Sequence, residues 1–242
     1  ANRLMRKAWP GPLTILLEEK NPESAPVLSG RHGATRDAIY YNGTVGLRCP
    51  DDAVCQGILE SVDAPVVAAS ANLAGKPPPR TGAEVLQGLE GKFDLLVDAG
   101  RTRYDRASTI VRVTESDYKL VREGVLDAGI VKRLALVHIL FVCTGNTCRS
   151  PMAAGLARKM LAERLGCDPR TLERHGVKVS SAGTSGGAGP ASSGALRAMS
   201  QRGVDLSNHA STALTSGLIQ QADHVFVMTQ AHLDVVLAMA PW

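Results

Sequence analysis

The sequence predicts an α/β protein of two domains, a mixed, twisted sheet followed by a parallel sheet. The first half contains several short apolar runs and few long helical patterns, which favours a mixed sheet. In the second half, strand-like runs alternate with helical patterns, which is typical of a parallel sheet with helices on both faces. Because 242 residues suffice for two ordinary domains, we expect domains at residues 1–134 and 135–242.

The composition, with 44% hydrophobic and 21% charged residues, is typical of a globular protein. The net charge of +4 suits an anionic substrate or RNA without requiring either. No apolar run approaches the roughly 20 residues that span a bilayer, so we expect no membrane partner. An odd count of five cysteines without a metal-type Cys-x2-Cys pair favours reduced thiols and a cytoplasmic location over disulfides.

Apolar periodicity and turn residues place the elements of the first half. Helices are expected at residues 2–8, 51–61, 81–89 and 127–134, and strands at 13–17, 44–48, 65–69, 94–97, 108–113 and 118–121. Residues 18–37 are polar, contain proline and glycine, and predict a loop. The strand at 65–69 would carry Ser70 and Asn72 to the carboxyl end of the sheet, where ligands bind in open α/β folds.

The second half has a regular alternation. Strands are expected at residues 135–142, 177–181 and 223–228, and helices at 152–165, 191–202, 216–221 and 232–239. Residues 183–189 are rich in glycine and serine and predict a loop inside this domain. The pattern therefore predicts three parallel strands that begin with the one at 135–142.

A polar stretch at residues 143–151, Cys-Thr-Gly-Asn-Thr-Cys-Arg-Ser-Pro, links the first of these strands to its helix. Ser150 is a favoured helix cap, and Pro151 suits the first helical position. A strand, a tight loop and a helix N-terminus can hold an anion on backbone N–H groups. The helix dipole and Arg149 would favour the thiolate of Cys143, so we predict a nucleophile that attacks phosphorus.

The spacing Cys-x5-Arg-Ser resembles the low-molecular-weight protein tyrosine phosphatase family. The segments SAGT at 181–184, GVDLSNH at 203–209 and ADHVFVMTQAH at 222–232 support the resemblance. It implies a flavodoxin- or Rossmann-like parallel sheet, a phosphorylated protein substrate, a phosphocysteine intermediate, and no cofactor or metal. The implied catalytic residues are Cys143 and Arg149, and the implied loop and support residues are Thr144, Gly145, Asn146, Thr147, Cys148, Ser150 and His209.

Several loop residues have individual expectations under this resemblance. Asn146 would adopt a left-handed conformation that His209 braces, although His209 could equally be a surface histidine. Cys148 would either trap Cys143 as a disulfide or be a small buried filler. Thr147, where tyrosine-directed members usually carry Ile or Leu, resembles the protein arginine phosphatases and implies phosphoarginine. Arsenate reduction is an alternative that needs a further resolving cysteine.

The first half carries a second resemblance. The segments WPGPLT, TVGLR followed by Cys-Pro, SAN-x-x-GKP, DAG, STIV and VREG, in this order, resemble the YrdC/Sua5 family. That family makes threonylcarbamoyl-adenylate from L-threonine, bicarbonate and ATP with Mg, the first step of the t6A modification of tRNA. The implied ATP-binding residues are Thr44, Ser70, Asn72 and Arg122, and the implied threonine-binding residues are Arg48 and Ser108. An alternative is a module that binds tRNA, double-stranded RNA or nucleotides without catalysis.

Both resemblances lack a segment that their families carry. The PTxTxYGL-like strand and Lys-x-Arg motif of the YrdC/Sua5 family have no counterpart, and no Asp-Pro-x-Gly segment with the phosphatase general acid follows Met239. We therefore expect the C-terminal half of a YrdC/Sua5 domain joined to the N-terminal two-thirds of a phosphatase domain. Loss of a general acid costs about 10²–10⁴ in rate, which predicts slow turnover.

Overall fold

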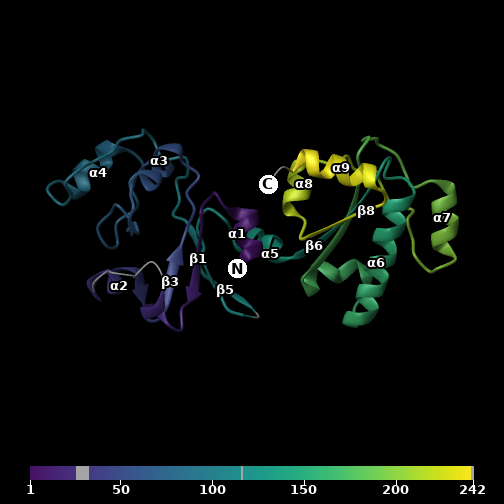
Figure 1. The fold of residues 1–242 in the computed structure, drawn as a ribbon, viewed down its shortest axis with the longest axis horizontal. Helices are drawn as coiled ribbons and strands as arrows, with labels where there is room; N and C mark the ends of the chain where they lie inside the picture. The colour runs from purple at the N-terminus through teal and green to yellow at the C-terminus, as the bar shows by residue number, and fades with distance from the viewer. Residues whose placement is uncertain (26–32, 116, 241–242) are drawn as a thin grey trace. The chain divides into compact units, whose positions relative to one another are not determined.

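The computed structural model describes residues 1–25, 33–115 and 117–240 of the 242-residue chain. The chain divides into two compact units, Ala1–Val131 and Lys132–Trp242, which are described separately below (Figure 1). Within the described ranges, each helix is too short or too polar to cross a membrane.

Unit 1 is built on a mixed sheet of five strands in the order β2-β3-β1-β4-β5. The strands are β1 (Leu13–Glu18), β2 (Tyr40–Tyr41), β3 (Thr44–Leu47), β4 (Thr109–Val113) and β5 (Tyr118–Arg122). Strands β1 and β4 pair in parallel and the other neighbours are antiparallel, so the predicted mixed sheet is confirmed. Leu13, Ile15 and Val111 are fully buried at its centre, as expected for the aliphatic, alternating pattern of these strands.

Helices and one 3-10 turn surround this sheet. They are α1 (Asn2–Ala8), η1 (Pro22–Ser24), α2 (Gly33–Ile39), α3 (Ala53–Ser61), α4 (Gly82–Leu89) and α5 (Ala128–Ala135), which crosses the unit boundary. Asp52 caps α3 by accepting a hydrogen bond from Cys55 N, and Thr81 caps α4 through Glu84 N. The loop expected at 18–37 therefore includes η1 and part of α2, and its residues 26–32 lie outside the described ranges.

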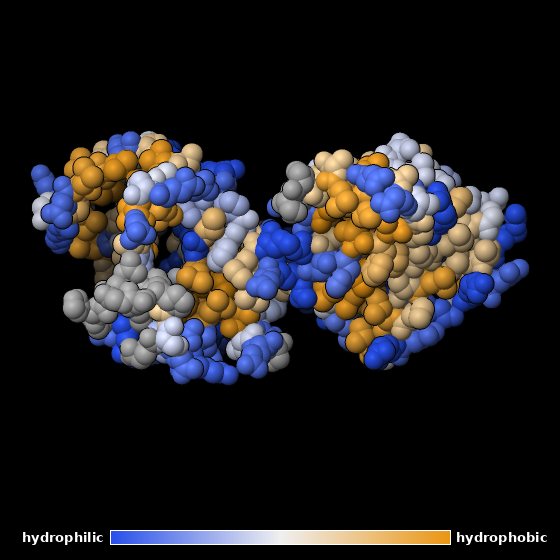
Figure 2. Space-filling view, in the orientation of Figure 1, coloured by the Kyte–Doolittle hydropathy of each residue, from blue (hydrophilic) through white to orange (hydrophobic). Residues whose placement is uncertain are grey.

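The strands expected at 65–69 and 94–97 are wrong. Both segments are irregular, and their apolar side chains are exposed by 49% at Val66, 59% at Val67 and 80% at Leu95. Apolar composition alone makes no strand, because a strand also needs a hydrogen-bonded neighbour and a covered face. Neither segment pairs with the five-stranded sheet. The surface of unit 1 around α3 and α4 is accordingly rich in apolar side chains (Figure 2).

Unit 2 contains three parallel strands, as predicted. Strand β6 (Val137–Cys143) lies between β7 (Val177–Gly183) and β8 (His224–Val227), giving the order β7-β6-β8. With β6 counted first, this is the 2-1-3 order of flavodoxin-like sheets, in which the chain reverses direction across the sheet at the first strand. The carboxyl end of β6 is therefore the expected position of a ligand site.

Helices cover both faces of this sheet. They are α6 (Arg149–Leu165), the 3-10 segment η3 (Pro169–His175), α7 (Ser193–Ser200), α8 (Ser216–Gln221) and α9 (Gln230–Met239). Leu140 and Val142 of β6 pack with Ile219 of α8 and Val236 of α9, whereas α6 lies on the other side of the strands (Figure 1). Helix α7 packs on α6 through Met199 and its neighbours. The end of β6 therefore lies between α8 and α9 on one face of the sheet and α6 on the other.

Candidate functional site

The centre of the site is the loop between β6 and α6. Cys143 is the last residue of β6 and is only 2% exposed. Its Sγ lies 2.9 Å from Ser150 Oγ, in the first turn of α6. The loop of residues 144–148 therefore curves over the thiol and returns to it, at the carboxyl end of the central parallel strand.

Ser150 does not cap α6, contrary to the sequence prediction. The helix begins at Arg149, its N-cap residue is Cys148, and no side-chain cap is made. Ser150 is fully buried, and its Oγ faces Cys143 Sγ and accepts from Asn146 Nδ2 at 2.8 Å. Since that oxygen already accepts from an amide, its own proton can be donated either to the sulfur or to Ala182 O, which lies 3.4 Å away.

The backbone N–H groups of this loop are free. From Thr144 to Cys148, none donates a hydrogen bond to an acceptor within the described residues. They precede a helix of 17 residues, whose first N–H groups are also without partners inside the helix. Unsatisfied N–H groups at a helix N-terminus attract an anion through both hydrogen bonds and the helix dipole.

Asn146 holds the loop in this shape. Its φ is +52°, the left-handed conformation that the sequence predicted, and its side chain is fully buried. Nδ2 donates to Ser150 Oγ and to Ser181 Oγ, each at 2.8 Å, while Oδ1 accepts from Thr212 N at 2.8 Å. The amide thus uses both of its donors and one acceptor, which fixes its orientation.

The backbone carbonyl of Asn146 is also held. His209 Nε2 lies 2.6 Å from this oxygen, and Ser211 Oγ donates to it at 3.0 Å. The expectation that His209 braces Asn146 is confirmed, and the alternative of a simple surface histidine is wrong. Ser181 and Ser211 were missed by sequence reasoning, although Ser181 opens the SAGT segment that supported the family resemblance.

Gly183, at the end of β7, is a third residue whose role the sequence did not reveal. A Cβ atom there would lie 2.6 Å from Thr144 O and 3.0 Å from Asn146 N. Such distances are shorter than real contacts, so only glycine allows the loop to lie this close to β7. In addition, Thr184 N donates to Cys143 O and Ser185 N to Thr144 O, which joins the two chain segments.

A buried histidine on α9 completes one side of the loop. Arg149 Nη2 donates to Thr144 Oγ1 at 3.1 Å, and Thr144 Oγ1 lies 2.9 Å from His232 Nε2. The other ring nitrogen, Nδ1, lies 2.8 Å from Thr229 Oγ1. Sequence reasoning missed His232 and Thr229, although both lie in the segment 222–232 that supported the resemblance.

Cys148 forms its hydrogen bonds with Ser192 and Thr147, not with Cys143. Its Sγ donates to Ser192 Oγ at 3.0 Å and lies 3.6 Å from Thr147 Oγ1. Side-chain hydrogen bonding with Ser192 and Thr147, together with the charge of Arg149, lowers the pKa of the Cys148 thiol below its ordinary value. The expected disulfide between Cys148 and Cys143 stays a prediction.

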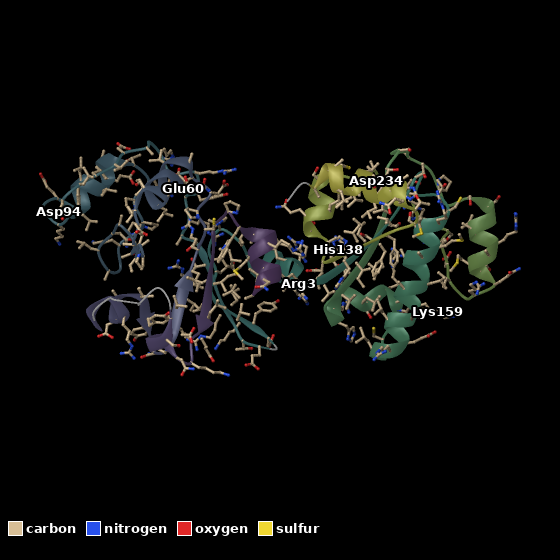
Figure 3. All side chains as sticks on the ribbon, in the orientation of Figure 1. Arg3, Glu60, Asp94, His138, Lys159 and Asp234 are labelled. Carbon is tan, nitrogen blue, oxygen red and sulfur yellow. The ribbon has the colours of Figure 1, made fainter. Side chains whose placement is uncertain are left out.

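A cavity of about 1000 Å³ also lies in unit 2, but away from the loop. It is lined by the second half of α6, by η3 and by residues 203–205, and Arg158 and Cys167 are among its walls. Figure 3 shows Lys159, another lining residue, on the part of unit 2 away from Asp234 of α9. Burial lowers the pKa of Arg158, whose guanidinium donates to Val179 O. This cavity is therefore separate from the loop of residues 144–148, whose residues are not among its walls.

In unit 1 the structure joins two of the predicted ligand-binding residues. Arg122 Nη2 donates to Ser108 O at 2.8 Å and to Ser108 Oγ at 3.3 Å. Ser108 Oγ also lies 3.0 Å from Thr14 Oγ1 on β1, a contact that sequence reasoning missed. The ends of β1, β4 and β5 therefore form one polar corner with an exposed guanidinium.

Of the other four predicted residues of unit 1, Thr44 and Asn72 bond to near neighbours in the chain, whereas Arg48 reaches Gly11, 37 positions earlier. Thr44 donates to Tyr41 O within the turn before β3, and Arg48 Nε donates to Gly11 O. Asn72 Nδ2 donates to the carbonyls of Leu73 and Lys76. Ser70 is exposed and follows a segment that is not the predicted strand. No hydrogen bond among the described residues connects these four with the Ser108–Arg122 pair.

The described residues also contain no group of three or more His, Cys, Asp or Glu that could hold a metal ion.

A buried thiol under free N–H groups, beside an arginine, is an arrangement that can hold an anion against a nucleophile. Residues 138–241 match the family described as low molecular weight phosphotyrosine protein phosphatase. A probable low molecular weight protein-tyrosine-phosphatase, EpsP, from Ralstonia solanacearum is 39% identical over 43% of this chain and 63% of its own length. A protein-arginine-phosphatase from Bacillus subtilis is 42% identical over 41% of this chain and 61% of its own length.

Residues 1–124, half of the chain, match the Sua5/YciO/YrdC family, described as telomere recombination, and the chain belongs to this family. The threonylcarbamoyl-AMP synthase of Pyrococcus abyssi is 31% identical over 51% of this chain and 33% of its own length. Along the chain, the synthase-related half precedes the phosphatase-related half, and both are domains of enzyme families. The chain spans about a third of this synthase and about three-fifths of the phosphatases.

Proposed function

We propose that residues 135–242 form a cysteine-dependent phosphatase module that acts on phosphorylated proteins. The observation that carries this proposal is the buried Cys143 beneath a loop with free N–H groups from Thr144 to Cys148. The three non-bridging oxygens of a phosphoryl group can be bound by an array of this kind, with Arg149 supplying a positive charge beside it.

The groups at the loop support a two-step reaction without a cofactor. Cys143 Sγ attacks phosphorus in line, a P–S bond forms, and the bond to the leaving group breaks with its electron pair. Ser150 donates to the sulfur from 2.9 Å, while Arg149 and the loop N–H groups stabilise charge on the equatorial oxygens. Water then attacks phosphorus, which releases phosphate and restores the thiolate.

The direct test is to incubate the purified chain with phosphorylated peptides and isolate the phosphocysteine by rapid acid quench and mass spectrometry. We expect phosphate to be bound at Cys143 and nowhere else, and Cys143→Ala to show none. A phosphatase activity that persists in Cys143→Ala would overturn the assignment of the nucleophile.

Within this module, we propose phosphoarginine as the preferred substrate over phosphotyrosine. Thr147 supports the preference because its hydroxyl lies in the loop, where it can orient water or a guanidinium N–H. One relative is named for arginine and another for tyrosine phosphatase activity at similar identity, so the choice depends on this residue. Measured kcat/KM for phosphoarginine and phosphotyrosine peptides should shift towards phosphotyrosine in Thr147→Ile. An unchanged ratio would contradict the preference.

We propose that residues 1–134 belong to a threonylcarbamoyl-AMP synthase module that uses ATP with Mg, L-threonine and bicarbonate. They would correspond to the C-terminal half of such a domain, and residues 135–242 to the N-terminal two-thirds of the phosphatase domain. In this view Arg122, Thr44, Ser70 and Asn72 contact ATP, and Arg48 and Ser108 contact threonine. The Ser108–Arg122 corner supports the proposal because its guanidinium is exposed next to a hydroxyl. Threonine-dependent exchange of pyrophosphate into ATP would test it, with Arg122→Gln as the variant expected to lose exchange.

A nucleic-acid-binding module is a second candidate for unit 1, favoured by the loop of residues 101–106. This loop carries three arginines, and the Arg103 guanidinium lies 5.5 Å from the centre of the Tyr104 ring. Binding of tRNA or double-stranded RNA that weakens with salt, without pyrophosphate exchange, would favour this candidate. The five free thiols agree with a reducing compartment such as the cytoplasm for either function.

Arsenate reduction is disfavoured by the position of the remaining thiol of unit 2. Cys167 follows the C-terminal end of α6, whereas Cys143 and Cys148 lie at its N-terminal end. A helix of 17 residues spans about 25 Å, so Cys167 is too far to relay a disulfide from Cys148.

A further inference from the structure

His232 is a buried polar residue at the phosphate loop. It lies in the first turn of α9, is only 5% exposed, and has a hydrogen-bond partner on each ring nitrogen. Threonine hydroxyls satisfy both polar atoms of this buried ring, and one of them belongs to the loop over Cys143. Its position therefore connects the start of α9 with the loop that covers Cys143.

The connection runs through a single hydroxyl. Thr144 Oγ1 accepts a hydrogen bond from Arg149 Nη2 at 3.1 Å and is 2.9 Å from His232 Nε2. In one tautomer, Thr144 donates to Nε2 and Nδ1–H donates to Thr229 Oγ1; in the other, both donations are reversed. Either tautomer fixes the Thr144 hydroxyl, because both nitrogens of the ring are held.

Arg149 is the last residue in the series of hydrogen bonds from His232 through Thr144, and its side chain must be held in place to bind an anion. Arg149 is exposed, and a long, exposed side chain loses much rotamer freedom when it is placed on a ligand. Its only hydrogen bond among the described residues is the one to Thr144. A side chain that is already held near its bound position loses less freedom on binding, so the complex is tighter.

We propose that His232 is a positioning residue that holds Arg149 at the phosphate loop by way of Thr144. The proposal relies on the phosphatase function proposed above, and it adds α9 to the elements that define the anion site. His232 touches neither the sulfur nor the anion in this arrangement. Its removal acts on the affinity for a tetrahedral oxyanion and on transfer to Cys143.

The test measures how inorganic phosphate protects Cys143 of the whole chain from iodoacetamide, with the labelled cysteine located by fragment-ion mass spectrometry. The dependence of the alkylation rate on phosphate concentration gives the Kd, without the need for turnover. Variants are His232→Leu, which removes both ring nitrogens, Thr144→Val, and the double variant. A glutamine places an amide near the position of Nε2, so His232→Gln tests rescue. The matched control is Gln230→Ala in the same turn of α9, where the side chain bonds only to Asp234.

We expect His232→Leu and Thr144→Val each to raise the Kd for phosphate about tenfold, the usual effect of a lost hydrogen bond to a charged group. The double variant should equal the single variants, since all three break the same series. His232→Gln should bind phosphate more tightly than His232→Leu, with thermal unfolding and circular dichroism unchanged. The control Gln230→Ala should have the same Kd for phosphate as the unaltered chain.

Two results separate the possible failures. If phosphate does not protect Cys143 in the unaltered chain, the anion site is absent, and both the proposed function and this inference are wrong. If phosphate protects the unaltered chain and folded His232→Gln and His232→Leu equally well, the inference alone is wrong. Additive effects of His232→Leu and Thr144→Val would also overturn it. If His232→Leu does not fold, the Kd values for phosphate of Thr144→Val and of the double variant Thr144→Val with His232→Gln are compared instead. Equal values support the inference, and a weaker Kd in the double variant overturns it.

Discussion

In unit 2 the residues expected to bind phosphate lie between Cys143 and Ser150, whereas in unit 1 those expected to bind ATP and threonine are spread from Thr44 to Arg122. The structure holds the unit 2 loop from three sides, by Ser181 and Gly183 of β7, by residues 209–212, and by His232 of α9. Of the six residues expected to bind ligand in unit 1, all of them described, a hydrogen bond joins Ser108 and Arg122 and no other pair. Residues of one strand-loop-helix junction are thus brought together by local chain geometry, whereas residues on distant segments depend on the packing of the whole unit.

The largest effect is expected when the thiol of the unit 2 loop is replaced, because the loop is arranged around Cys143. In Cys143→Ala the loss of the nucleophile should lower phosphoenzyme formation and iodoacetamide labelling at this position to background. Cys148→Ser is the matched control, because Cys148 bonds to Ser192 and should leave labelling of Cys143 in place. If the two variants lost phosphoenzyme equally, the loop would not contain a single nucleophile.

Thr109 tests whether the polar corner of unit 1 is built as firmly as the unit 2 loop. Its fully buried Oγ1 accepts from Gly124 N and Leu126 N and donates to Leu126 O. Thr109→Val keeps the shape but leaves these backbone groups without a partner, so the free energy of unfolding should fall by about 2–4 kcal/mol. Urea unfolding measures the loss, and Thr109→Ser, which keeps the hydroxyl, should show much less. Equal stabilities of the Val and Ser variants would refute this account.

Gly183 tests the close approach of β7 to the unit 2 loop. In Gly183→Ala the new methyl would meet the backbone of Thr144 and Asn146, which cannot withdraw without moving the loop. We expect a loss of about 1–3 kcal/mol in the free energy of unfolding, together with weaker phosphate protection of Cys143. Gly187→Ala is the control, since its methyl has no neighbour within 4 Å. Similar behaviour of the two variants would show that the close approach is unimportant.

The smallest effect is expected at Cys148. Its hydrogen bond with Ser192 is the largest cause of the lowered pKa of this thiol, so Ser192→Ala should raise the pKa towards its ordinary value. Fewer thiolates are then present at pH 7, and alkylation of Cys148 should slow by about two- to fivefold, with the difference vanishing at high pH. The neighbouring, exposed Ser193→Ala should leave the rate unchanged. A faster reaction in Ser192→Ala would reverse the assigned sign.

The sequence predicts the unit 2 fold well because its strands are short, apolar and separated by helical patterns. It predicts the loop because all its parts are adjacent in the chain. It misses His232 and Gly183, whose roles depend on which distant backbone they approach, and it assigns Ser150 to a cap although its hydroxyl is used by Cys143 and Asn146. Residues 65–69 show the opposite error, since an apolar run predicts a strand without revealing whether a neighbouring strand is there to pair with it.

The contacts of Asn146 also determine when the loop over Cys143 takes its shape during folding. Its amide binds Thr212 N, 66 positions later in the chain, and its carbonyl accepts from Ser211. Contacts of such separation form late, because a long loop must close before they contribute any stability. During synthesis, Cys143 therefore leaves the ribosome well before the residues that shape its loop. The loop over Cys143 therefore takes its shape only after the segment around Thr212 has emerged and docked.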